Sequence, residues 1–158
     1  MEFINKGIYF MKYDKETSLG YALTTTLNIL RKKFNNDIKK YNITSEQYGV
    51  MKLIEKEKLT PTNLANLLNR DKATITRIIN SLEKKGLIKK ELINKKSFFV
   101  KLNKNGKNIL QKAEKVAINY HDFIVEKIGE DEIEKMLKTL ADIRKILKGK
   151  EWKNFYYL

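Results

Sequence analysis

Cysteine is absent from this 158-residue chain, and histidine occurs once, as His121. Without thiols the chain has no disulfide scaffold and no thiolate metal site, which fits a cytoplasmic location. One histidine cannot form a multi-histidine zinc cluster. We therefore expect neither a metal site nor a cofactor.

Proline, glycine and long apolar runs are also scarce. The chain has one proline and seven glycines, so few residues interrupt helices. No run approaches the roughly 18 apolar residues of a membrane span, and residues 1–16 lack the features of a signal peptide. We expect no membrane partner, and Met11 is an alternative candidate for the first residue.

The sequence also lacks the usual marks of an enzyme. It has no glycine-rich phosphate loop, no paired histidines and no carboxylate pair at a spacing that suits acid–base chemistry. We therefore expect a binding protein rather than an enzyme.

Basic residues are abundant and unevenly placed. Lys and Arg number 33 against 19 Asp and Glu, a net charge of +14. Residues 70–107 hold twelve basic and three acidic residues, so a quarter of the chain carries +9 of that charge. A lysine excess is often only a solvated surface, but this concentration favours double-stranded DNA as a partner.

Three helices are predicted before the basic stretch. Apolar residues recur every three or four positions over 13–41, which indicates a long helix. Thr44 and Gln47 have capping-box spacing before a helix over 45–56. Thr60 is a candidate N-cap and Pro61 suits the first turn of a short third helix. Its inward residues are expected to be Leu64, Leu67 and Leu68.

A fourth helix is predicted between Asp71, a candidate N-cap, and Gly86, a candidate left-handed C-cap. At 100° per residue its buried face consists of Ile75, Ile78, Ile79 and Leu82. The opposite face consists of Ala73, Arg77, Asn80 and Lys84, with Thr74, Thr76 and Ser81 at its margins.

After Gly86 the spacing of apolar residues changes from one typical of a helix to one typical of a strand. Alternating residues over 87–93 and 97–103, joined by "NKK", predict a β-hairpin. Asn103 caps a helix over 104–128, and Gly129 separates it from a last helix over 130–148. The fold class is mainly α with a small hairpin. The aromatic tail is expected to dock on a neighbouring helix or a partner subunit, through Trp152, Phe155, Tyr156 and Tyr157.

The outer face of the fourth helix suits a DNA major groove. Small residues permit close approach, Arg can bond guanine, Asn can bond adenine, and a Thr methyl can contact thymine. An ordinary surface helix would carry more glutamate than the single Glu83. Helix, turn, helix and basic hairpin together describe a winged helix-turn-helix.

The segment "LTPTNLANLLNRDKATITRIINSLEKKGLIKK" resembles the MarR family of transcription regulators. The resemblance covers about residues 14–148 and is tightest over 59–110. It implies a homodimer, a DNA-binding module over 44–103 and dimerisation helices within 1–43 and 104–158. It also implies a regulator, more often a repressor, that binds a pseudo-palindromic operator and is released by a small aromatic or anionic ligand.

Candidate contact residues come from this resemblance and from the helical wheel. The resemblance implies base contacts by Ala73, Thr74, Thr76 and Arg77, to which the wheel adds Asn80 and Lys84. Candidate DNA-backbone contacts are Thr60, Thr62, Asn63, Arg70 and Lys72. Candidate wing contacts are Lys89, Lys90, Asn94, Lys95, Lys96 and Ser97.

The wing departs from the family pattern. The family commonly carries an Asp-x-Arg motif that braces the hairpin, whereas this chain has Asn94, Lys95 and Lys96 there. Lysine is a hydrated point charge, so we expect these side chains to contact phosphates rather than to sense groove width.

Two questions stay open at the level of sequence. Candidates for lining an effector crevice are Tyr21, Tyr41, Tyr48 and Tyr120, although aromatic residues at helical spacing also suit a plain core. A low-specificity architectural nucleic-acid-binding protein would use the same basic surface, mainly through lysine, and is the alternative function.

Overall fold

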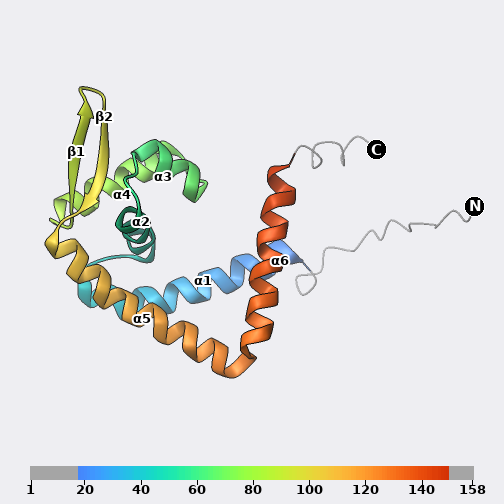
Figure 1. Ribbon diagram of the computed structural model, residues 1–158. Helices are drawn as coiled ribbons and strands as arrows, with labels where there is room; N and C mark the ends of the chain where they lie inside the picture. The colour runs from blue at the N-terminus through green and yellow to red at the C-terminus, as the bar shows by residue number, and fades with distance from the viewer. Residues whose placement is uncertain (1–17, 150–158) are drawn as a thin grey trace, which may run out of the picture. The chain divides into compact units, whose positions relative to one another are not determined.

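A computed structural model describes residues 18–149 of the protein (Figure 1). The predicted aromatic tail and the alternative start at Met11 lie outside these residues. The elements, in order, are α1 (Leu19–Ile38), η1 (Lys39–Tyr41), α2 (Ser45–Lys56), α3 (Pro61–Leu68), α4 (Lys72–Lys84), β1 (Ile88–Asn94), β2 (Ser97–Leu102), α5 (Lys104–Ile128) and α6 (Glu130–Lys148). The predicted fold class and element order are confirmed.

The chain divides into two compact units, one ending at Ala113 and the other beginning at Glu114. The first unit contains α1 through β2 and the beginning of α5. The second contains the remainder of α5 and α6. The functional division at residues 43 and 103 stays a prediction.

Side-chain caps fix where the helices of the first unit begin. Thr44 and Gln47 form the predicted capping box of α2, and Thr60 and Asn63 form a second one at α3. Asp71 Oδ1 accepts a hydrogen bond of 2.7 Å from a backbone N–H in the first turn of α4. The caps satisfy backbone donors that have no partner inside the helix, and in the two capping boxes the bonds are reciprocal.

The first helix ends earlier than predicted. It ends at Ile38 and continues as one 3-10 turn to Tyr41, because Asn42 adopts a left-handed conformation with φ of 57°. Asn35 Oδ1 accepts from the backbone N–H of Ser45 at 2.6 Å, which attaches α1 to the start of α2.

The core of the first unit lies between the helices and the hairpin. The predicted inner face of α4 is buried throughout, at Ile75, Ile78, Ile79 and Leu82. On α3 the expectation for Leu67 is wrong, because this side chain is 57% exposed while Leu64 and Ala65 are buried. The buried face of α3 therefore includes fewer leucines than the sequence predicts.

The hairpin is antiparallel, with Ile88 opposite Leu102. The backbone N–H of Val100 donates to Leu59 at 2.9 Å, adding a one-residue bridge from the segment before α3. A Cβ at Gly106 would lie 2.0 Å from the carbonyl oxygen of Leu87, so only glycine permits this close approach of α5 to the hairpin.

The second unit contains the remainder of α5 and α6, which are separated as predicted at Gly129, with φ of 100°. The first turn of α6 holds three acidic residues, which stabilise the positive end of the helix dipole. No helix within residues 18–149 is long and apolar enough to cross a membrane.

Candidate nucleic-acid interface

The outer face of α4 is exposed as the sequence predicts. Ala73, Thr76, Arg77, Asn80 and Lys84 all face solvent. Arg77 and Asn80 have no side-chain hydrogen-bond or ion-pair partner within residues 18–149. The guanidinium fork and the amide are therefore both available for bidentate bonds to bases.

The two threonines of this face use their hydroxyl protons within the protein. Thr74 Oγ1 donates to Asp71 at 2.7 Å, and Thr76 Oγ1 donates to the carbonyl of Lys72, also at 2.7 Å. Hydrogen bonds from the backbone and then the hydroxyl of Thr74 lower the pKa of Asp71. Thr76 is thus left with its methyl group as the main means of contacting a base.

The end of α4 is fixed by a polar network that the sequence did not reveal. Gln47 is buried, and its Nε2 donates to Ser81 Oγ at 2.9 Å. Lys85 Nζ donates to Gln47 Oε1 at 2.9 Å and to the carbonyl of Asn42 at 2.6 Å, and burial lowers the pKa of Lys85. Ser81 therefore belongs to this support and not to the margin of the outer face.

The side chains that are candidates for DNA-backbone contacts differ in whether they already have a partner within the protein. Thr60 and Asn63 are held by each other in the capping box of α3. Arg70 is paired with Glu46 at 3.4 Å. Thr62 and Lys72 are exposed, and no partner for either side chain occurs in the part of the chain that the structure describes. These two are the better candidates for phosphate contacts.

All three acidic residues of the basic stretch are engaged. Asp71 caps α4, Glu83 pairs with Lys90 at 2.6 Å, and Glu91 pairs with both Lys101 and Lys58. The hydrogen bond from Lys101 is the main cause of the lowered pKa of Glu91. Eight exposed cations have no ion pair inside the described range 18–149: Lys72, Arg77, Lys84, Lys89, Lys95, Lys96, Lys104 and Lys107. The excess positive charge is thus directed to solvent.

Some of the candidate wing residues hold the hairpin in place, and others remain available to contact DNA. Lys90 Nζ is bonded to Glu83 and lies 5.3 Å from the ring centroid of Phe98, so it braces the hairpin against α4. Asn94 Oδ1 accepts from the backbone of Lys96 at 2.9 Å within the turn, and Ser97 is half-buried. The free wing candidates are Lys89, Lys95 and Lys96. The brace that the family motif would supply is replaced by an ion pair at the base of the hairpin.

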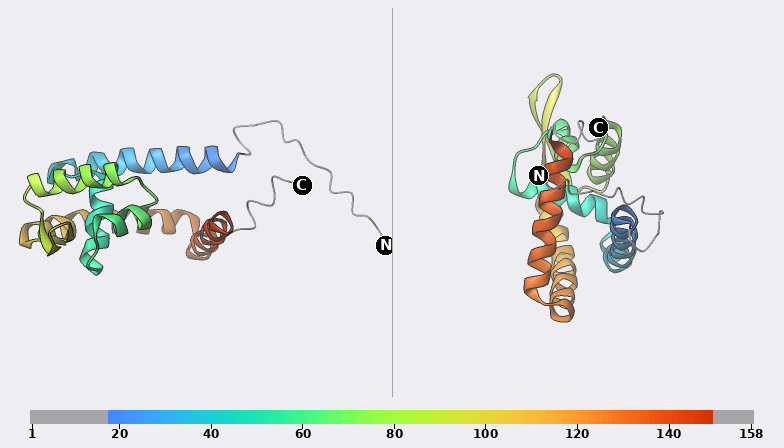
Figure 2. Two further views of the ribbon diagram at one scale, coloured as in Figure 1. Left: turned by 90° about the horizontal axis from the view of Figure 1, so that it is seen from above. Right: turned by 90° about the vertical axis from the view of Figure 1, so that its right-hand side faces the viewer.

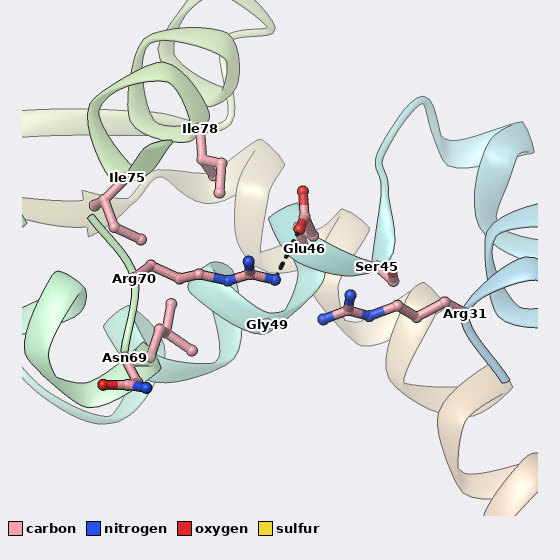
Figure 3. Close-up of a pocket in the computed structure, with 9 residues that line it drawn as sticks. Arg31, Ser45, Glu46, Gly49, Asn69, Arg70, Ile75 and Ile78 are labelled. Carbon is pink, nitrogen blue, oxygen red and sulfur yellow. Dashed lines mark hydrogen bonds and ion pairs between the residues drawn. The ribbon is translucent and has the colours of Figure 1, made fainter. Parts of the chain in front are cut away.

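A pocket of about 380 Å³ lies between α1, α2 and the segment leading into α4 (Figure 3). The side chains of Arg31 and Arg70 enter the pocket from opposite sides, and Arg70 is bonded to Glu46. Its lining consists of Arg31, Ser45, Glu46, Gly49, Leu68, Asn69, Arg70, Ile75 and Ile78. None of the four candidate tyrosines lines it, and Tyr48 instead packs edge-on against Phe34 with ring centroids 5.1 Å apart.

This arrangement of helices and hairpin defines a winged helix-turn-helix protein. Residues 43–94 match the model of the MarR family. The S. aureus MepR–DNA complex superposes with a TM-score of 0.76 at 19% identity, covering 83% of this chain and 98% of that one.

Two structures of CouR are also similar. The repressor bound to a 23-mer DNA duplex has a TM-score of 0.75 at 25% identity, covering 82% of this chain and 94% of that one. CouR from Rhodococcus jostii RHA1 bound to p-coumaroyl-CoA has a TM-score of 0.74 at 17% identity, covering 83% and 94%. No curated protein sequence matches the chain.

The match over residues 43–94 confirms the predicted resemblance to the MarR family of transcription regulators. The matched family and the similar structures are transcription regulators rather than enzymes. Among the described residues, no group of three or more His, Cys, Asp or Glu side chains could hold a metal ion.

Proposed function

We propose that the protein is a sequence-specific DNA-binding regulator that binds a pseudo-palindromic operator as a homodimer. The observation that carries this proposal is the outer face of α4, where Arg77 and Asn80 stand free among small residues. In the major groove Arg77 bonds guanine, Asn80 bonds adenine and the Thr76 methyl group contacts thymine. Lys95 and Lys96 of the hairpin neutralise phosphates.

Similarity to MepR and CouR supports DNA as the partner, because both are seen in DNA complexes. The CouR structure is that of a repressor and is 25% identical, which favours repression as the sign of regulation. Action on DNA also accords with a cytoplasmic location.

The exposed apolar residues of the single chain support a homodimer. Leu19, Leu23, Leu27 and Leu30 form one stripe on α1, each between 38% and 53% exposed. On α6 of the second unit Met136, Leu137, Ile146 and Leu147 are exposed too. Apolar surfaces of this kind mark protein interfaces. Sedimentation equilibrium should therefore give twice the mass of the chain, and Leu23→Asp with Leu27→Asp should shift it toward the single-chain value.

The pocket beside Arg70 supports release by a small aromatic anion. Arg31 has no ion-pair partner within the described residues, and Arg70 directly precedes the N-cap of α4. A ligand carboxylate that replaces Glu46 on Arg70 would shift the start of α4. A panel of aromatic carboxylates should include one that weakens operator binding by the wild type but not by Arg31→Ala.

Selection from a random duplex library separates this function from the architectural alternative. A two-fold symmetric regulator should enrich an inverted repeat with half-site centres about 10 base pairs apart, or a multiple of the helical turn. An architectural protein that binds mainly through lysine should enrich no consensus sequence.

A further inference from the structure

The closed end of the hairpin combines aliphatic side chains with free cations. Leu92 is 77% exposed, the highest value for a large apolar side chain among residues 18–149, and the adjacent Ile93 is 46% exposed. After Asn94, Lys95 and Lys96 form the turn. An exposed aliphatic pair on a two-stranded ribbon invites aggregation unless a partner covers it.

The surrounding charge indicates what kind of partner this is. Lys89, Lys95 and Lys96 are exposed and have no ion pair in the described part of the chain. No acidic residue occurs over 92–107, and Glu91 is already held by Lys101 and Lys58. The partner must therefore offer an apolar surface between negative charges. The minor groove of DNA, with sugars and base edges between two rows of phosphates, fits this description.

The geometry of the hairpin ties the strand that carries Leu92 and Ile93 to α4. Leu92 pairs with Phe98 and Asn94 with Ser97, so Ile93 is an extra residue in a β-bulge. Bulges bend a strand and redirect its side chains. Lys90 fastens the same strand to Glu83 of α4.

Figures 1 and 2 both show the closed end of the hairpin projecting past α2, α3 and α4. If α4 lies in the major groove, as the proposed function has it, a hairpin that projects in this way is placed to reach the adjacent minor groove.

We propose that Leu92, supported by Ile93, is a wedge that enters the minor groove beside the segment contacted by α4 and partly unstacks one base step there. This inference rests on the proposed function. Aliphatic side chains used in this way kink the duplex, and pyrimidine–purine steps unstack most easily. The flanks of the operator are then specified by deformability, with TA or CA steps preferred to A-tracts, while Lys95 and Lys96 bind the bordering phosphates.

Fluorescence of 2-aminopurine tests the wedge directly. The base replaces adenine at successive flanking positions of a duplex enriched by the wild-type full chain. Saturating wild-type protein should raise the fluorescence severalfold at one step in each flank, because 2-aminopurine brightens when it is unstacked. The double variant Leu92→Ser, Ile93→Ser should still bind this duplex but leave the fluorescence at the level of free DNA.

Two control variants separate the wedge from general binding. Leu67→Ser removes a similarly exposed leucine from α3 and should keep the full fluorescence rise. Lys95→Ala with Lys96→Ala should weaken binding and flatten its salt dependence, yet keep the rise at saturation.

Three results would overturn the wedge. The first is no rise with bound wild-type protein at any flanking position, and the second is an equal rise with the double variant. The third is a changed sedimentation behaviour of the double variant without DNA, which would assign the pair to a protein contact. If the wild type enriches no duplex at all, the proposed function has failed as well.

Discussion

The helix α4 and the hairpin are both basic, but they differ in how their side chains are held. α4 is anchored along its whole inner face by buried residues and at its end by the Gln47–Ser81–Lys85 network. The hairpin is attached through Lys90 to Glu83, through Glu91 to Lys58 and through Val100 to Leu59, whereas its closed end carries free lysines beside exposed Leu92. On the proposed function the two elements use positive charge differently: fixed donors on α4 discriminate between bases, whereas loosely held lysines on the hairpin supply affinity.

The largest expected effect concerns the anchoring of α4. Leu82 is fully buried, so Leu82→Ala should lower the free energy of unfolding by about 2 to 5 kcal/mol through lost burial and a cavity. Urea denaturation measures this change. Leu67→Ala is the matched control on an exposed leucine and should stay within about 0.5 kcal/mol of the wild type. Equal losses in the two variants would contradict the assigned faces.

The next effect tests discrimination by α4. Arg77→Ala should weaken binding to the enriched operator by about 1 to 3 kcal/mol and relax the preference at one or two positions of each half-site. Fluorescence anisotropy on single-base variants of the operator measures both changes. An equal weakening on every sequence would mean that Arg77 contacts phosphate and not a base.

A smaller and different effect is expected from the wing. Lys95→Ala with Lys96→Ala should weaken binding to all duplexes alike and reduce the slope of log K against log salt by about 2, because two phosphate contacts are lost. Titrations at several salt concentrations give this slope. A slope equal to that of the wild type would remove these lysines from the interface.

The smallest effect concerns one carboxylate at the start of α4. The pKa of Asp71 is lowered in the folded protein, so its stabilising effect is present above its unfolded pKa and is lost as the pH falls through the folded pKa. Asn also caps helices well, so Asp71→Asn should unfold near the wild-type midpoint at pH 7. As the pH falls below about 4, the ordinary range of an Asp carboxyl, the wild type should lose more thermal stability than the variant. Parallel losses would contradict this role for Asp71.

The sequence predicted what depends on neighbours along the chain. The caps at Thr44, Thr60 and Asp71, both faces of α4 and the hairpin follow from local spacing and periodicity, and the structure confirms them. These features need only the helical and strand repeats and the bonds within one turn. Local spacing therefore sufficed for the scaffold of the candidate site.

What the sequence did not reveal depends on residues far apart in the chain. Arg70 is taken up by Glu46, and Lys90 by Glu83, because folding brings their elements together. The sequence predicted only a capping role for Gln47, although its side-chain amide also donates to Ser81, 34 residues further on. The pattern of charge could show that the surface is basic but not which lysines remain free.

The most direct test of the account is the ratio of two affinities at one near-physiological salt concentration. Binding is measured to the duplex that the protein enriches and to a scrambled duplex of the same length and composition. A specific regulator built on α4 should bind the enriched duplex at least about a thousandfold more tightly. Equal affinity for the two duplexes would contradict the account and leave the architectural function.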